Sequence, residues 1–247
     1  MNLAINRNEI NNVFYQGFGL PLVDYFPPWR DDFKDEWAPY PGLNGETGAA
    51  GGWPYPGDGD PDQARALLAA AGYPNGVDVT LDCLLSHQVV SEWPDICEQV
   101  VDYWATVGVN ATLDWSADFG DFRAKTRDPS HNGGNWLWSA SPSLDPSCNA
   151  ITYSMVWELG QAYREWPAAS ELFFRCAEIT NYDERRKAGQ DFAEAWLEGH
   201  FSVPLVWVFA EVAVNPNIVE EYEVNMLHMG PVRITSIPSP FIASPPG

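Results

Sequence analysis

Aromatic and acidic side chains cluster in two stretches of this sequence, and these residues are the best suited to chemistry. The stretch "LDWSADF" carries Trp115, and "NWLWSASPSLDP" carries Trp136 and Trp138. Exposed tryptophan faces bind sugar rings by apolar contact, while nearby carboxylates and amides bind the hydroxyl groups. The carboxylates near these tryptophans are Asp114, Asp118, Asp121 and Asp145. The chain contains twelve tryptophans, and such surfaces would suit an oligosaccharide or another neutral polar solute.

An enzyme is the competing interpretation of the same carboxylates. Retaining and inverting glycosidases both need two carboxylates that face one sugar ring, and the sequence singles out no such pair. It contains no nucleophile elbow, HExxH zinc motif or phosphate-binding loop. The cysteines show no CxxC spacing and no histidine at zinc-ligand intervals. We therefore predict no catalytic, cofactor-binding or metal-binding residue, and keep a glycoside hydrolase-like enzyme and a stand-alone interaction domain as alternatives.

The tryptophans also have a purely structural interpretation. Trp136 and Trp138 lie on the same side of a predicted strand, because alternate residues of a strand share a face. In that interpretation both side chains belong to the core. The residue pattern alone leaves the binding role and the core role open.

The charge balance excludes several classes of partner. The 247 residues include 34 acidic and 13 basic residues, which gives a formal net charge of -21. Such a surface repels nucleic acid and anionic membranes. No run of about 18 apolar residues is present, so we predict no membrane-spanning helix. The opening "MNLAINRNEINNVF" lacks the basic and apolar regions of a signal peptide.

A helix with both ends specified lies in "DPDQARALLAAAGYPNG", residues 60–76. Asp60 is a good N-cap and Pro61 suits the first helical position. Gly72 and Pro74 then end the helix. The apolar stripe that we predict to be buried consists of Ala64, Leu67, Leu68 and Ala71.

Other segments alternate between helix and strand patterns. The opening helix, which ends at Gly17, is predicted to bury Ile5, Ile10, Val13 and Phe14. Strand patterns cover 77–85, 109–115, 135–140 and, interrupted by Pro204, 201–214; helix patterns cover about 93–107, 117–127, 168–179 and 182–198. Residues 19–60 read as a long Pro/Gly-rich loop. This alternation predicts an α/β layered domain.

The four cysteines divide into two groups. Cys83 lies on the apolar side of the strand pattern, so we predict a small core residue there. Cys148 and Cys176 flank an irregular segment, and we predict that they pair as a disulfide if the compartment is oxidising.

Four motifs resemble a known family when read in order. They are "AINRNEI", "DPDQARALLAAAGYPNGVDVTL", "CEQVVDYWATVGVNATLDWSADFGDFRAKTRD" and "NYDERRKAGQDFAEAWLEGHFSVPLVWV". Together they resemble the C-terminal half of extracytoplasmic solute-binding proteins of ABC importers, family 5, the peptide/nickel/oligosaccharide class. The resemblance implies the second lobe of a periplasmic-binding-protein-like fold (type II, cluster C), with a mixed sheet flanked by helices and the N-terminal lobe absent.

The resemblance also implies ligand contacts. The family's "GW-x-x-D…DP" signature matches Trp138, Ser139 for the small residue after it, and Asp145 for the later Asp-Pro. Ser141 stands where peptide-binding members carry the aspartate that holds the peptide ammonium. A neutral hydroxyl makes no charge-assisted bond to an ammonium, so this departure disfavours peptides with a free N-terminus. Trp115 matches a cleft tryptophan, and Arg123 lies near a family arginine that reaches the ligand.

The implied protein captures a peptide, oligosaccharide or similar small polar solute by closure of two lobes, and delivers it to ABC permease subunits. Residues 1–205 would form the ligand-closing C-terminal lobe, and residues 206–247 would return towards the missing N-terminal lobe. We therefore expect the chain to be a fragment. The resemblance places it in the periplasm or at the cell surface, although the chain carries no signal peptide.

Overall fold

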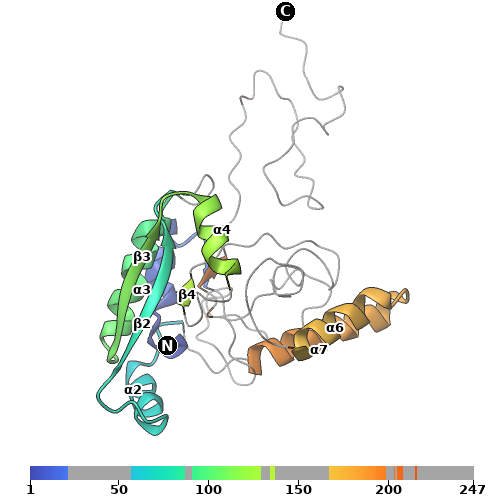
Figure 1. The fold of residues 1–247 in the computed structure, drawn as a ribbon, viewed down its shortest axis with the longest axis horizontal. Helices are drawn as coiled ribbons and strands as arrows, with labels where there is room; N and C mark the ends of the chain where they lie inside the picture. Colours follow the sequence, from blue (N-terminus) through green and yellow to red (C-terminus); the bar gives the residue numbers. More distant parts are fainter. Residues whose placement is uncertain are drawn as a thin grey trace, which may run out of the picture.

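Three parallel strands form the larger sheet, in the order β3-β2-β4 (Figure 1). Strand β2 spans Val77–Leu84, β3 spans Val109–Ser116 and β4 spans Gly134–Trp136. The central strand β2 pairs in parallel with both neighbours. The structure is a computed structural model, and it describes residues 1–21, 57–86, 91–128, 134–136, 167–198, 203, 205–207 and 215.

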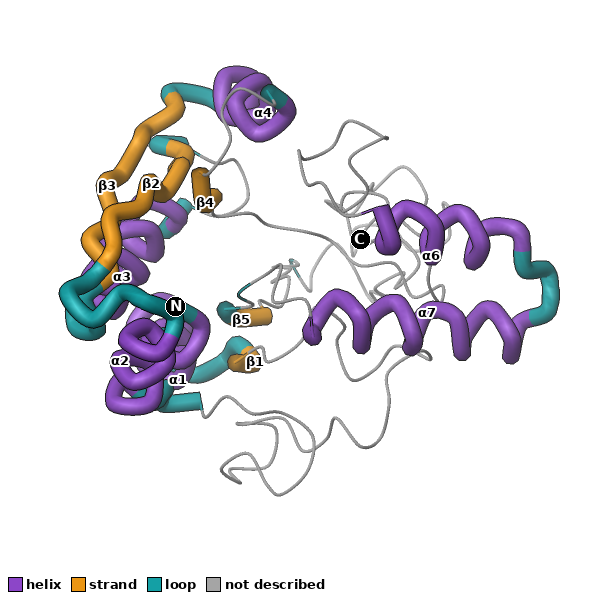
Figure 2. Tube along the Cα trace, turned by 60° about the horizontal axis from the view of Figure 1, so that its bottom comes forward, coloured by secondary structure: helices purple, strands orange, loops and turns teal. Residues whose placement is uncertain are grey.

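Helix α3 (Trp93–Ala105) connects β2 to β3 and covers one face of the sheet (Figures 1 and 2). A parallel pair of strands needs such a crossover, because the chain must return to the same end of the sheet. Helix α2 (Pro61–Ala70) precedes β2, and α4 (Phe119–Arg127) follows β3. These elements confirm the predicted α/β alternation.

The signals at the ends of α2 act as predicted. Asp60 Oδ1 accepts a hydrogen bond from the backbone N–H of Gln63 at 2.9 Å, and Pro61 is the first helical residue. Gly72 adopts φ +95°, a left-handed conformation that side chains disfavour. The predicted buried stripe is only partly correct. Ala64 is buried, but Leu67 is 55% exposed, because only one edge of the helix packs against the N-terminal segment Asn2–Ala4 (η1).

The opening helix α1 spans Arg7–Tyr15. Ile5 and Ile10 are buried as predicted, whereas Val13 is 61% exposed and faces away from the core. Glu9 accepts a hydrogen bond from the Tyr103 hydroxyl of α3 at 2.8 Å. At the other end of α1, burial and a hydrogen bond to Glu92 raise the pKa of Tyr15. These two contacts tie α1 to both ends of α3.

The main core lies between α1, α3 and the sheet. Its buried members include Ile10, Leu81, Ile96, Val100, Trp104 and Val109. Their positions follow the predicted periodicity of helix and strand. Val203, Leu205 and Val206 pack against the same core, so chain from both sides of the predicted 205/206 domain boundary contributes to it.

A second, two-stranded sheet joins β1 (Leu20–Pro21) to β5 (Val206–Trp207) in antiparallel register. Strand β1 lies at the start of the segment that we predicted to be a loop, and residues 22–56 of that segment lie outside the described residues. The prediction of one mixed sheet is not met by the described strands. The larger sheet is parallel throughout its described part, and the antiparallel pair is separate.

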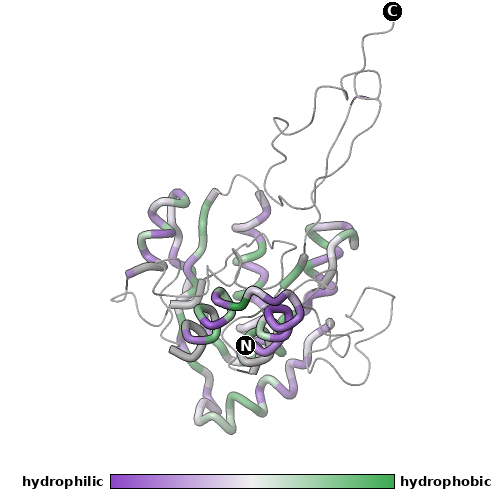
Figure 3. The backbone as a smooth tube through the Cα atoms, turned by 90° about the vertical axis from the view of Figure 1, so that its right-hand side faces the viewer, coloured by the Kyte–Doolittle hydropathy of each residue, from purple (hydrophilic) through white to green (hydrophobic). Residues whose placement is uncertain are grey.

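Helices α6 (Pro167–Glu178) and α7 (Tyr182–Glu198) form an antiparallel hairpin, with bounds close to those predicted from the sequence. Figures 1 and 2 both show this hairpin on the side of the molecule away from α3. Cys176, Ala188 and Phe192 are buried. Hydrophobic and hydrophilic residues alternate along the described helices (Figure 3), as expected for helices that bury one face.

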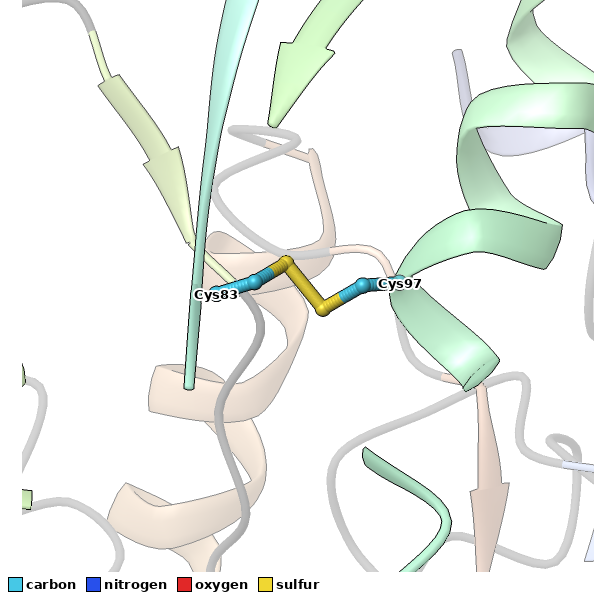
Figure 4. Close-up of a disulfide and its surroundings, with 2 residues drawn as sticks. All are labelled: Cys83 and Cys97. Atoms are coloured by element: carbon cyan, nitrogen blue, oxygen red, sulfur yellow. A yellow bond between two sulfur atoms is a disulfide. The ribbon is translucent and has the colours of Figure 1, made fainter. Parts of the chain in front are cut away.

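A disulfide between Cys83 of β2 and Cys97 of α3 fastens the helix to the sheet (Figure 4). Both residues are fully buried. The prediction of Cys83 as a simple core residue is therefore wrong about its chemistry and right about its burial. The sequence offered no sign of this partner, because the pairing depends on α3 lying across β2. Cys176 is also disulfide-bonded, but Cys148 lies outside the described residues, so the Cys148–Cys176 pairing stays a prediction.

Candidate ligand-binding site

The carboxyl ends of the three parallel strands form the candidate site. Trp115 is the second-last residue of β3, and Trp136 is the last residue of β4. Ligands of open α/β sheets bind outside the carboxyl ends of the strands, because the loops that follow converge there. The fold thus brings positions 115 and 136, 21 residues apart in sequence, to one edge of the sheet.

The register assigns these two positions to opposite faces of the sheet. Trp115 pairs with Cys83, and Trp136 pairs with Asp82, across β2. Paired residues share a face and successive residues alternate. Trp115 therefore lies on the face covered by α3, where it is half-buried and packs against the core. Positions 115 and 136 therefore lie at the same end of the sheet but on opposite faces of it.

Sequence reasoning missed the polar residues Asp82 and Ser116. Both are fully buried, on the face away from α3. Asp82 is also in register with Asp114 of β3. Cys83 was predicted on the apolar side of this strand, which leaves residue 82 on the other side, yet both faces of β2 are buried at its carboxyl end. The one available signal was an acidic residue within the otherwise apolar run "LDCLL".

Helix α4, which follows β3 in the chain, carries Arg123. Its first turn is capped by Asp118, whose Oδ1 accepts from the backbone N–H of Asp121 at 3.0 Å. Phe122 is fully buried and packs edge-on against Trp93, with ring centroids 6.2 Å apart. The guanidinium of Arg123 lies 5.6 Å from the ring centroid of Phe119, a cation–π distance. Arg123 is therefore held beside Phe119 and remains partly exposed, and its contact with a ligand stays a prediction.

Lys125 joins α4 to β3. Its Nζ donates to Asp114 Oδ1 at 3.0 Å and reaches the carbonyl oxygen of Trp115 at 3.5 Å. Asp114 therefore has an ion-pair partner, and Asp118 serves as a helix cap. These roles account structurally for two of the carboxylates that suggested a glycosidase.

Four predicted ligand contacts lie outside the described residues, namely Trp138, Ser139, Ser141 and Asp145. Their roles stay predictions. In the described part of the chain, no group of three or more His, Cys, Asp or Glu side chains is arranged to hold a metal ion. No helix there is both long and apolar enough to cross a membrane.

The fold is that of periplasmic binding proteins. A solved structure of HbpA2 from Haemophilus parasuis superposes with a TM-score of 0.65 at 18% identity, and covers 83% of this chain and 38% of its own. A dipeptide-binding protein from Pseudoalteromonas sp. SM9913, solved in complex with Met-Leu, gives a TM-score of 0.62 at 20% identity, with the same coverage.

The sequence defines the family within that fold. Residues 1–157 match the family described as bacterial extracellular solute-binding proteins, family 5 middle. This match covers more than half of the 247 residues, and the chain belongs to that family. The family resemblance predicted from the four ordered motifs is thereby confirmed.

Curated relatives are similar over different lengths. Heme-binding protein A of Haemophilus influenzae is 27% identical over 225 residues, which is 87% of this chain and 36% of that protein. Glutathione-binding protein GsiB of Escherichia coli K12 is 31% identical over 113 residues, which is 46% of this chain and 18% of that protein. The chain therefore matches about a third or less of the length of these relatives.

Proposed function

We propose that this chain supplies one side of the ligand pocket of a solute-binding subunit of an ABC importer. The observation that carries the proposal is that Trp115 and position 136 lie at the carboxyl ends of two strands of one parallel sheet, with Arg123 on the helix that follows β3. Its membership of the solute-binding family supports the same role. The pocket closes when a second lobe moves over this edge, as in other hinged binding proteins.

The proposed ligand is a small polar solute, such as an oligosaccharide or a peptide-like compound without a charged amino end. Arg123 offers a guanidinium to carbonyl or carboxylate oxygens. Trp115, Trp136 and Trp138 offer apolar faces, and Ser139, Ser141 and Asp145 offer hydrogen bonds. Ser141 in place of an aspartate disfavours a ligand ammonium. Known ligands of the relatives, which include glutathione and the dipeptide Met-Leu, suggest the first compounds to test.

The proposed compartment is extracytoplasmic. The family is described as extracellular, and the buried Cys83–Cys97 disulfide suits an oxidising environment. Delivery of the solute to ABC permease subunits is part of the same proposal.

A calorimetric titration of the 247-residue chain tests ligand binding. The probes are Met-Leu, reduced glutathione, hemin and maltotriose. We expect binding of at least one probe without turnover, and loss of about fivefold in affinity in Trp138→Ala, because an aromatic contact of this kind contributes about 1 kcal/mol. Ser141→Asp should raise affinity for Met-Leu. Hydrolysis of an aryl glycoside by the chain would instead support the glycosidase alternative.

The proposal of a second lobe is tested separately in the source cells. An antibody raised against residues 60–130 measures the size of the native protein. A band well above the 27.5 kDa of this chain would support a two-lobed protein. A band at 27.5 kDa would contradict that part of the proposal and favour the stand-alone interaction domain.

A further inference from the structure

One lysine forms an ion pair with a carboxylate at the edge of the proposed pocket. Lys125 is one of only three lysines in the chain, and its Nζ lies 3.0 Å from Asp114 Oδ1. The side chains of Lys125 and Asp114 are 23% and 41% exposed, so a solute that approaches from solvent can reach this pair. Asp114 directly precedes Trp115, and Lys125 lies two residues after Arg123. Asp114 and position 136 are both in register with Asp82, so the pair lies on the same face of the sheet as one proposed ligand contact.

The local charges explain why a cation is held there. Asp82 and Asp114 are register partners on adjacent strands, which places two acidic residues side by side on the face away from α3. A cation beside these acidic residues is electrostatically favourable. Lys125 supplies that cation from within the chain.

We propose that Lys125 determines the charge of the ligand that this edge accepts. Its ammonium pairs with the Asp114 carboxylate, which a ligand ammonium would otherwise bind. The pocket therefore favours ligands whose end near Asp114 is uncharged. This inference rests on the proposed function. It adds to the argument that Ser141 disfavours a ligand ammonium, because Lys125 and Ser141 would then both disfavour a ligand with a free amino group.

The physical reason is competition within one molecule. A tethered ammonium has a high effective concentration at its carboxylate, so a ligand ammonium must displace it to bind there. The displaced Lys125, together with the neighbouring Arg123, would also repel the incoming positive charge. Specificity of this kind arises from rejecting the wrong ligand as much as from binding the right one.

The test compares two peptides that differ in one charge, Met-Leu and N-acetyl-Met-Leu, by calorimetric titration of the full chain. We expect wild-type protein to favour the acetylated peptide. Lys125→Met keeps the apolar stem and removes the ammonium, and it should shift the affinity ratio towards Met-Leu by about tenfold or more. Lys125→Arg keeps the charge and should retain the wild-type ratio.

A matched control is available in α7. Lys187 Nζ lies 3.0 Å from Asp191 Oδ1, the same separation as in the Lys125–Asp114 pair, but far from β3 in the chain. Lys187→Met should leave the affinity ratio unchanged. A shift of equal size in Lys187→Met would overturn the inference, because the effect would then come from overall charge.

An unchanged ratio in Lys125→Met would overturn the inference while leaving the proposed function in place. Binding of neither peptide by any variant would also overturn it, and the four-probe titration then decides separately whether the chain binds a solute. If Lys125→Met does not fold, Asp114→Asn gives the second test. Without the carboxylate, Lys125 should repel Met-Leu more strongly, and tighter binding of Met-Leu would contradict the inference.

Discussion

Gly76 and Gly108 touch where β2 and β3 begin. A Cβ atom added to Gly76 would lie 2.4 Å from the carbonyl oxygen of Gly108, and the same oxygen accepts a hydrogen bond from the N–H of Val77 at 2.9 Å. Both glycines have positive φ, +94° and +88°. The turns at Gly76 and Gly108 thus place the first residues of β2 and β3 side by side. This contact agrees with the register of Val77 with Val109.

Replacing Gly76 with alanine should destabilise the protein strongly. Alanine disfavours the positive φ, at a cost of about 1–2 kcal/mol, and its Cβ would collide with backbone, which adds about 1–3 kcal/mol. Gly72→Ala is the matched control, because Gly72 has φ +95° and no atom within 4 Å of the added Cβ. Urea unfolding measures both variants. Equal losses would show that the Gly76–Gly108 contact does not matter.

Removing the Cys83–Cys97 disulfide should cost about 3 kcal/mol of stability, because the closed loop of 14 residues no longer restricts the unfolded chain. The measurement is the unfolding free energy of the double variant Cys83→Ala/Cys97→Ala. A labelling reagent for thiols should find neither cysteine in the folded wild-type protein. Labelling of both without a reductant would contradict the disulfide.

Asp60→Ala should destabilise the protein by about 1 kcal/mol, because the N–H of Gln63 loses its capping acceptor at the start of α2. Asp60→Asn keeps an oxygen acceptor, and should retain most of the stability. Thermal unfolding of the three proteins distinguishes a cap from a simple effect of charge, since both substitutions remove the same negative charge.

The free energy of unfolding should fall in alkaline solution, because Tyr103 loses its proton more readily in the unfolded chain than in the folded one. Burial, and then the hydrogen bond to Glu9, raise the pKa of Tyr103 above its ordinary value, which is about 10. The unfolded chain therefore releases this proton at lower pH than the folded one. The stabilising contribution is complete below about pH 10 and is lost as the pH rises further.

Urea unfolding at about pH 8 and about pH 10.5 measures this loss. Tyr103→Phe should show a smaller loss than wild-type protein between these two conditions. Tyr73→Phe, at an exposed position, is the control and should keep the wild-type loss. An alkaline loss of the same size in Tyr103→Phe would rule out this tyrosine as a source.

Local signals in the sequence were sufficient for the helices and for the family. The bounds of α2 follow from Asp60, Pro61 and Gly72, which act within one short segment. The same holds for α6 and α7, whose predicted ranges agree with the structure within a residue or so. Caps and terminating glycines act through bonds to their own neighbours, and for that reason their effects can be read without knowing the rest of the fold.

The composition of the site was only partly predictable. Trp115 and Arg123 were proposed from the family resemblance and stay predictions, while Asp82, Ser116 and Lys125 were not singled out. Alternation along β2 assumed one face in solvent, and it failed at Asp82 because elements on both sides cover the end of the central strand. The prediction that Leu67 is buried failed for the opposite reason. An apolar stripe on a helix is buried only where another element packs against it.

The sequence by itself determined the main helices, the strands β2 and β3, the family that the chain belongs to and the residue types that could hold a solute, whereas β1 fell within a predicted loop. Only the tertiary structure decided that Cys83 meets Cys97, that Lys125 meets Asp114, and that Trp115 and position 136 lie on opposite faces of one sheet. Each of these depends on strand register or on how a helix crosses the sheet. Register and crossing are set by packing between distant segments, whereas the ends of a helix are set by its own residues.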